Sequence, residues 1–140
     1  LGMANKSDLL LGYGTLEGEF AGDLHIFGDC YKTDIIEMAK TLELPRELIE
    51  KRSSRNLRPH QTDLDDLGAP WSKVDDALNQ LIEGADPESL IEKGMDSLMV
   101  HRVSRLIHQN KNKFDHLQII PLGRLTESIK KAQAAEASSA

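Results

Sequence analysis

Cysteine is nearly absent from this sequence, since Cys30 is the only one among 140 residues. A single cysteine excludes the internal disulfide framework that holds many small secreted domains together. No apolar run approaches the roughly 20 residues that span a bilayer, and the first residues lack the basic-then-apolar layout of a signal peptide. We therefore expect a cytoplasmic chain that does not act at a membrane.

Basic residues are fewer than acidic ones. The sequence has 17 lysines and arginines and 23 aspartates and glutamates, which gives a formal net charge of -6. Because phosphates repel an acidic surface, we expect no nucleic-acid partner. Hydrophobic residues make up 39% and charged residues 29%, as is ordinary for a soluble globular protein. The length suits one domain or part of a larger one.

Common metal-site motifs are missing as well. The five histidines form neither a zincin pair nor a Cys-His zinc spacing. Asp63, Asp65 and Asp66 hint at a calcium-binding loop, but Val74 stands where such a loop needs its bidentate glutamate.

Helical spacing of apolar residues is the main structural signal. Asn5 and Ser72 are candidate N-terminal caps of helices. Ile35, Met38 and Leu42 lie on one face of the predicted helix at residues 33–42. The predicted helices are residues 5–12, 33–42, 45–51, 72–84, 88–93 and 96–109. Predicted buried residues of the last helix include Leu98, Met99 and Val103.

The sequence therefore predicts a mostly helical chain. Residues 1–124 read as one unit, and residues 125–140 as a tail in which a helix frays into disorder. Two architectures fit: an isolated helical bundle, or the helical flank of an α/β domain whose parallel strands lie elsewhere.

Residues 52–70 show no period and are predicted to be a long loop. A basic stretch at its start, formed by Lys51, Arg52, Arg55 and Arg58, precedes three aspartates. This stretch is either a solvated segment of mixed charge or a loop that grips phosphates.

Four blocks together resemble the ammonia-dependent NAD synthetases. Residues 2–8 (GMANKSD) are similar to G-T-x-N-K-S-E, and residues 28–33 (GDCYKT) to G-[DE]-L-[YF]-K-T. Residues 51–57 (KRSSRNL) are similar to K-P-P-S-A-D-L, and residues 59–68 (PHQTDLDDLG) to P-G-Q-T-D-x-x-x-L-G. The blocks occur in the family's order and spacing, over roughly residues 2 to 120.

The resemblance implies an α/β parent fold of the Rossmann-like adenine nucleotide alpha hydrolase type, of which this chain would be the C-terminal, mostly α-helical portion. It implies a ligase that adenylates deamido-NAD with ATP, releases pyrophosphate, and lets ammonia displace AMP to give NAD. The family's S-G-G-x-D-S loop, which holds the ATP pyrophosphate, is absent from these residues. The isolated chain is therefore expected to be inactive.

Site roles also follow from the resemblance. Asp8 matches the family's magnesium-binding glutamate, and Lys32 and Ser54 match ATP-binding positions. Lys32 also stands at a predicted helix start, where the helix dipole favours phosphate.

Deamido-NAD is assigned to Asp23 and to the pair Asn112 and Lys113, of which only the lysine is retained from the family's His-Lys pair. The expected partners are thus deamido-NAD, ATP, Mg²⁺, ammonia and a second copy of the chain in a homodimer.

Some positions depart from the family. Met3 replaces an ATP-contacting threonine, and Leu16 stands where many members have a substrate-binding lysine. These departures keep open a second hypothesis, in which the chain is a non-catalytic helical interaction module descended from the enzyme.

Overall fold

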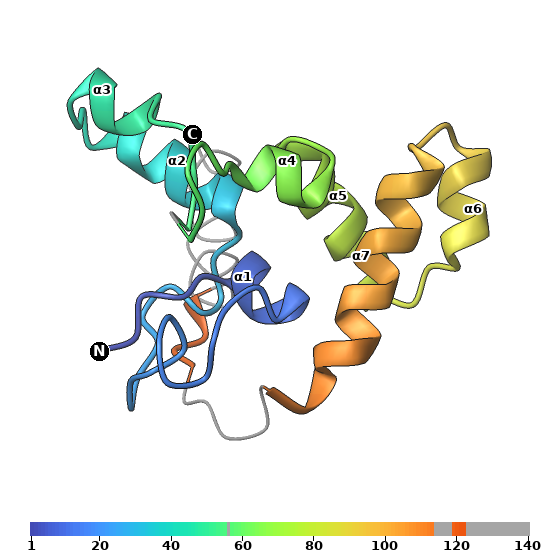
Figure 1. Ribbon diagram of the computed structural model, residues 1–140, viewed down its shortest axis with the longest axis horizontal. Coiled ribbons are helices and arrows are strands. Elements are labelled where there is room, and N and C mark those ends of the chain that lie inside the picture. Colours follow the sequence, from blue (N-terminus) through green and yellow to red (C-terminus); the bar gives the residue numbers. More distant parts are fainter. Residues whose placement is uncertain (56, 114–118, 123–140) are drawn as a thin grey trace, which may run out of the picture.

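The computed structural model describes residues 1–55, 57–113 and 119–122, so the predicted tail lies outside the described residues. The elements are mostly helical, as expected from the sequence (Figure 1). They are α1 (Lys6–Leu11), α2 (Lys32–Thr41), α3 (Arg46–Ile49), α4 (Asp63–Leu67), α5 (Trp71–Ile82), α6 (Pro87–Glu92), α7 (Ser97–Asn110) and the 3-10 helix η1 (Lys111–Lys113). Among the helices described, none is long and apolar enough to cross a membrane.

Local capping explains where the well-predicted helices begin. The Asn5 side chain accepts a hydrogen bond from the backbone N–H of Asp8 at 3.0 Å, which caps α1. Asp96 caps α7 in the same way, accepting from Met99 N–H at 2.8 Å. Gly12 ends α1 with a φ of 58°, a left-handed conformation that favours glycine.

Two predictions about helix position were wrong. Helix α5 begins at Trp71 after Pro70 and has no side-chain cap, so Ser72 lies inside its first turn. The predicted loop at residues 52–70 contains α4, whose N-cap Thr62 accepts a hydrogen bond from Asp65 N–H at 3.1 Å. Five residues are too few to show an apolar period, which is why the pattern missed this helix.

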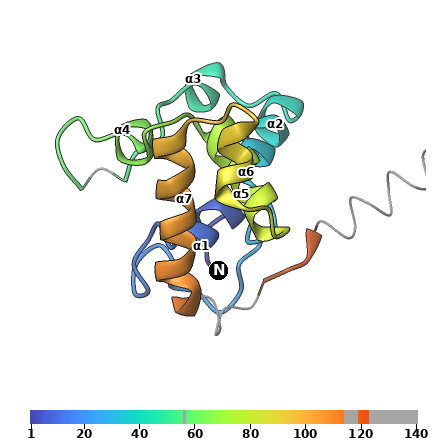
Figure 2. The same cartoon turned by 90° about the vertical axis from the view of Figure 1, so that its right-hand side faces the viewer.

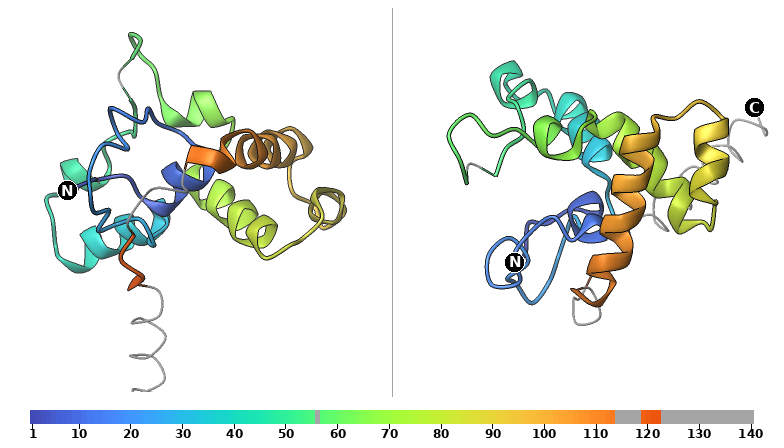
Figure 3. Two further views of the ribbon diagram at one scale, coloured as in Figure 1. Left: turned by 90° about the horizontal axis from the view of Figure 1, so that it is seen from below. Right: turned by 45° about the vertical axis from the view of Figure 1, so that its right-hand side comes forward.

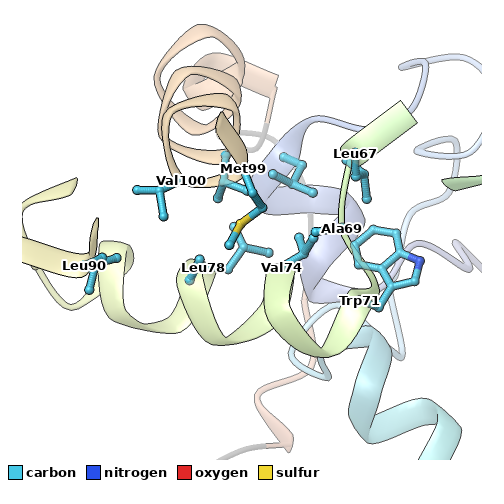
Figure 4. Close-up of a cluster of buried hydrophobic side chains, with 11 residues drawn as sticks. Leu67, Ala69, Trp71, Val74, Leu78, Leu90, Met99 and Val100 are labelled. Atoms are coloured by element: carbon cyan, nitrogen blue, oxygen red, sulfur yellow. The ribbon is translucent and has the colours of Figure 1, made fainter. Parts of the chain in front are cut away.

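The main core lies where α7 packs against α1, α5 and α6 (Figure 2). Met99 and Val100 of α7 face Val74 and Leu78 of α5, and Leu90 of α6 lies at one end (Figure 4). These five side chains are at most 3% exposed. Leu98 was predicted to share this face but is 80% exposed, because one step of 100° along α7 turns it toward solvent.

Helix α2 lies to one side of this core and contains no buried residue. Its predicted stripe ends in Leu42, which is 71% exposed, and Met38 is 38% exposed. The same side of the chain carries parallel backbone bridges from His25 to Gly2 and to Ile119. Two isolated parallel bridges, and a helix without a buried residue, favour the flank of an α/β domain over a self-contained bundle. Helix α2 lies apart from α6 (Figure 3).

Candidate functional site

Segments far apart in the sequence line a polar cavity of about 500 Å³. Asp8 comes from α1, Lys32 from the start of α2, and Ser54 from the segment before α4. The cavity thus brings together the three side chains that the sequence assigned to ATP and magnesium. Four basic side chains (Lys32, Lys51, Arg52, Arg55) and three acidic ones (Asp8, Glu19, Asp63) line it, so its charge is suited to an anion.

Asp8 lies at the cavity wall with its side chain 21% exposed. One carboxylate oxygen, Oδ2, accepts a hydrogen bond from Asn5 Nδ2 at 2.6 Å. The other, Oδ1, lies 3.7 Å from Nη2 of Arg55. Burial raises the pKa of Asp8 to about 6, although the nearby charges of Lys32 and Arg55 act in the opposite direction.

A buried carboxylate from α5 fixes the position of Lys32. Asp75, which is 5% exposed, accepts a hydrogen bond from Ser7 Oγ at 2.6 Å. It also accepts from the backbone N–H of Thr33 at 2.9 Å and from its hydroxyl at 2.8 Å. The Ser7 hydroxyl in turn accepts from Lys32 N–H at 2.8 Å. This network ties the first turn of α2 to α1 and α5, and thereby sets where Lys32 enters the cavity.

Replacing Asp75 by alanine is expected to lower the free energy of unfolding by about 1–3 kcal/mol, because the donors of Ser7 and Thr33 lose their acceptor. The burial that raises the pKa of Asp75 offsets part of this loss. Urea denaturation would measure the change. The control is Asp76→Ala on the same helix: that exposed side chain accepts only from Gln80 among the bonds described, and its loss should change stability by under about 0.5 kcal/mol. Equal midpoints for the two variants would contradict the network's role.

The basic stretch divides into two parts. Lys51, Arg52 and Arg55 line the cavity, together with Ser53 and Ser54. Arg58 instead is 70% exposed and pairs with Asp66 at 2.7 Å. Arg58 therefore fits the interpretation as a solvated segment, and phosphate binding by Lys51, Arg52 and Arg55 stays a prediction.

Asp23 and Lys113, two of the residues assigned to deamido-NAD, are not among those that line this cavity. Asp23 is exposed. Lys113 donates from Nζ to the carbonyls of Gly12 and Gly14, at 3.1 and 3.4 Å, and so holds the turn after α1. Asn112 belongs to η1, and its side chain lies outside the described residues. Their roles stay predictions.

Tyr13 and Glu19 also line the cavity, and neither was singled out from the sequence. Tyr13 donates to Asp66 at 2.7 Å and to Asp63 at 3.2 Å, which joins the end of α1 to α4. Burial and these carboxylates raise the pKa of Tyr13 well above its usual range, so it stays a neutral donor. A glycine-rich segment carries no periodic signal, so only the fold reveals these contacts.

The side chains at the cavity offer few ligands for a metal ion. Among the residues described, no group of three or more histidine, cysteine or acidic side chains is arranged to hold a metal ion. Asp8, to which the metal is assigned, lines the cavity together with two further carboxylates, Glu19 and Asp63, and with Ser53 and Ser54. That set fits Mg²⁺, which commonly takes one or two carboxylates and completes its shell with water and substrate phosphates.

A family model and curated relatives match most of this chain. A family model described as NAD synthase matches residues 1–116. The NH(3)-dependent NAD(+) synthetase of Chlorobaculum tepidum is 38% identical over 114 residues, which are 81% of this chain and 41% of the relative. The enzyme of the same name from Wolinella succinogenes is 41% identical over 114 residues, 81% of this chain and 44% of the relative. The chain thus spans less than half the length of these relatives.

A solved structure shows the fold. The NMN synthetase from Francisella tularensis superposes with a TM-score of 0.63 at 21% identity, over 80% of this chain and 42% of that one. The predicted parent fold, an α/β fold of the adenine nucleotide alpha hydrolase type, is therefore confirmed, with the helices described here forming part of it.

Proposed function

The chain belongs to the NAD synthase family, and we propose that it forms part of a ligase that converts deamido-NAD to NAD with ATP and ammonia. The observation that carries this proposal is the convergence of Asp8, Lys32 and Ser54 on one cavity of net positive charge. Curated relatives at 33–41% identity carry the same activity in their names.

The proposed reaction has two steps. A carboxylate oxygen of deamido-NAD attacks the α-phosphorus of ATP, and the bond to pyrophosphate breaks, which leaves an acyl adenylate. Neutral ammonia then attacks the acyl carbon, and AMP departs with the oxygen that came from the carboxylate. Negative charge grows on the departing pyrophosphate in the first step, so fixed cations and hydroxyls near it stabilise the transition state.

The cavity side chains suit this task. Lys32 is the first residue of α2, where the positive end of the helix dipole adds to the attraction of its side chain for phosphate. Lys51 and Arg52, from the segment after α3, add positive charge to the cavity, and the Ser54 hydroxyl offers a further polar contact. We assign ATP to this cavity, with Lys32 and Ser54 as its binding residues.

Mg²⁺ is the proposed metal, held by Asp8. When bound, such an ion neutralises phosphate charge and orients the polyphosphate. Asp8 is one methylene shorter than the glutamate of the family motif, and its carboxylate would supply the same hard oxygen donors.

Deamido-NAD is proposed to contact Asp23, Asn112 and Lys113, which would put this substrate beside the turn after α1 that Lys113 holds. Lys113 would then both bind the substrate and stabilise this turn.

We further propose a cytoplasmic homodimer, on the strength of the family resemblance and the single cysteine.

The test is product formation by the natural protein that contains these residues. Purified protein with deamido-NAD, ATP, Mg²⁺ and ammonium should form NAD and AMP in equal amounts. Deamido-NAD left unchanged, by a folded protein that shows no affinity for ATP, would instead favour the non-catalytic interaction module.

A further inference from the structure

Arg55 has an environment unlike that of the other arginines of its segment. Its side chain is only 11% exposed, and its guanidinium stacks over the ring of Tyr13, with Cζ 3.7 Å from the ring centroid. Nη1 pairs with Glu19 at 3.1 Å, and Nη2 lies 3.7 Å from Asp8. Nε is buried with no hydrogen-bond partner among the described residues.

These contacts place a fixed positive charge at the carboxylate assigned to magnesium. Asp8 Oδ2 is already engaged by Asn5, so Oδ1 is the oxygen left for a cation, and Oδ1 is the one that faces Arg55. A divalent cation bound to that oxygen would lie within a few ångströms of the guanidinium. Like charges at such a distance repel strongly in a partly buried site. A cation at Oδ1 would therefore be disfavoured as long as Arg55 stays beside Asp8.

Arg55 departs from the family motif that residues 51–57 resemble. In the register of the K-P-P-S-A-D-L block, Arg55 stands at the alanine, a side chain that could not reach Asp8. A methyl group would leave both Asp8 and Glu19 without this counter-charge.

We propose that Arg55 is an internal counter-ion that competes with a divalent cation for Asp8, so that tight cation binding requires a polyphosphate to draw the guanidinium away. This inference rests on the proposed metal role of Asp8. The cavity already holds Lys32, Lys51 and Arg52, so phosphates bound there would lie within reach of Arg55 as an alternative partner. Cation and nucleotide binding are thus coupled through one side chain, and the coupling must be reciprocal.

The experiment uses Mn²⁺ alone as a spectroscopic probe, titrated into the natural protein without nucleotide and followed by electron paramagnetic resonance. Arg55→Met removes the charge while keeping an unbranched side chain on the Tyr13 ring. We expect Mn²⁺ to bind this variant about fivefold more tightly or better, as expected for removing a partly buried like charge. Adding ATP should tighten Mn²⁺ binding more in the wild-type protein than in the variant.

Controls separate this inference from the proposed function. Arg58→Met makes the same change at an exposed arginine outside the cavity and should leave Mn²⁺ affinity unchanged. Asp8→Asn combined with Arg55→Met should abolish the gain. Arg55→Gln is the second variant if the methionine variant fails to fold.

The outcomes are distinct. Equal Mn²⁺ affinities for wild type, Arg55→Met and Arg55→Gln, with binding still lost in Asp8→Asn, would overturn the competition and leave Asp8 as the metal ligand. Mn²⁺ binding that is indifferent to Asp8 in every variant would remove the metal role of Asp8, and the competition with it.

Discussion

Expressed alone, the 140 residues are expected to form no measurable NAD from deamido-NAD, ATP and ammonia. They span 41–46% of the curated relatives they match, and Asp8, Lys32 and Ser54, which we propose for ATP and its metal, would supply only part of such a site. The family's phosphate-binding loop would add preorganised donors, and losing one such donor typically costs about 10²–10³ in rate. Losing all of them should bring turnover to background.

Exposed apolar surface should also make the isolated chain unstable. Leu42, the C-cap residue of α2, is 71% exposed, and Met3, next to the bridging residue Gly2, is 64% exposed. Side chains like these mark surfaces that other structure usually covers. The assay compares NAD production by the purified chain with that of the full-length Wolinella succinogenes enzyme. Turnover by the chain above background would show that its ATP chemistry needs only the residues described here.

Lys32→Ala in the natural protein is expected to lower kcat/KM for ATP about ten- to a hundredfold. A charge-assisted contact to phosphate contributes roughly 1.5–3 kcal/mol, and that contribution sets the range. The loss should exceed that of any other single lysine change in this chain, including Lys51→Ala, because the Asp75 network holds Lys32 in place.

Lys40→Ala is the matched control for that variant. Lys40 lies on the same helix but pairs with Glu37 at 2.6 Å on an exposed face, outside the cavity lining. Its removal should leave the kinetics unchanged. Steady-state kinetics at varied ATP concentration would measure kcat/KM for each variant. Wild-type kinetics for Lys32→Ala would contradict the assignment of Lys32 to the ATP site.

Helix positions could be read from local sequence because their signals are local. Asn5 and Asp96 cap their helices within three residues, and apolar spacing marks the buried faces of α5 and α7. The same reasoning failed for α4, which is shorter than the period that would reveal it. It also misjudged Leu98, because an apolar residue at a helix start can point away from the core.

The candidate site was less accessible to sequence reasoning. Asp8, Lys32 and Ser54 were found through the resemblance, and the structure places them at one cavity. Asp75 and Arg55 act through contacts that span many residues, from Asp75 to Ser7 and from Arg55 to Asp8. No local pattern encodes such pairs. A buried carboxylate or guanidinium becomes recognisable only once the fold shows what it touches.

One isotope measurement tests the central claim most directly. The natural protein is given ATP, ammonium and deamido-NAD labelled with oxygen-18 in its carboxylate, and the AMP formed is analysed by mass spectrometry. If the carboxylate attacks the α-phosphorus in the cavity of Asp8, Lys32 and Ser54, each AMP carries one labelled oxygen, and Lys32→Ala slows the appearance of that label. AMP free of label, formed while NAD accumulates, would contradict adenylation of the substrate and with it the function proposed for this site.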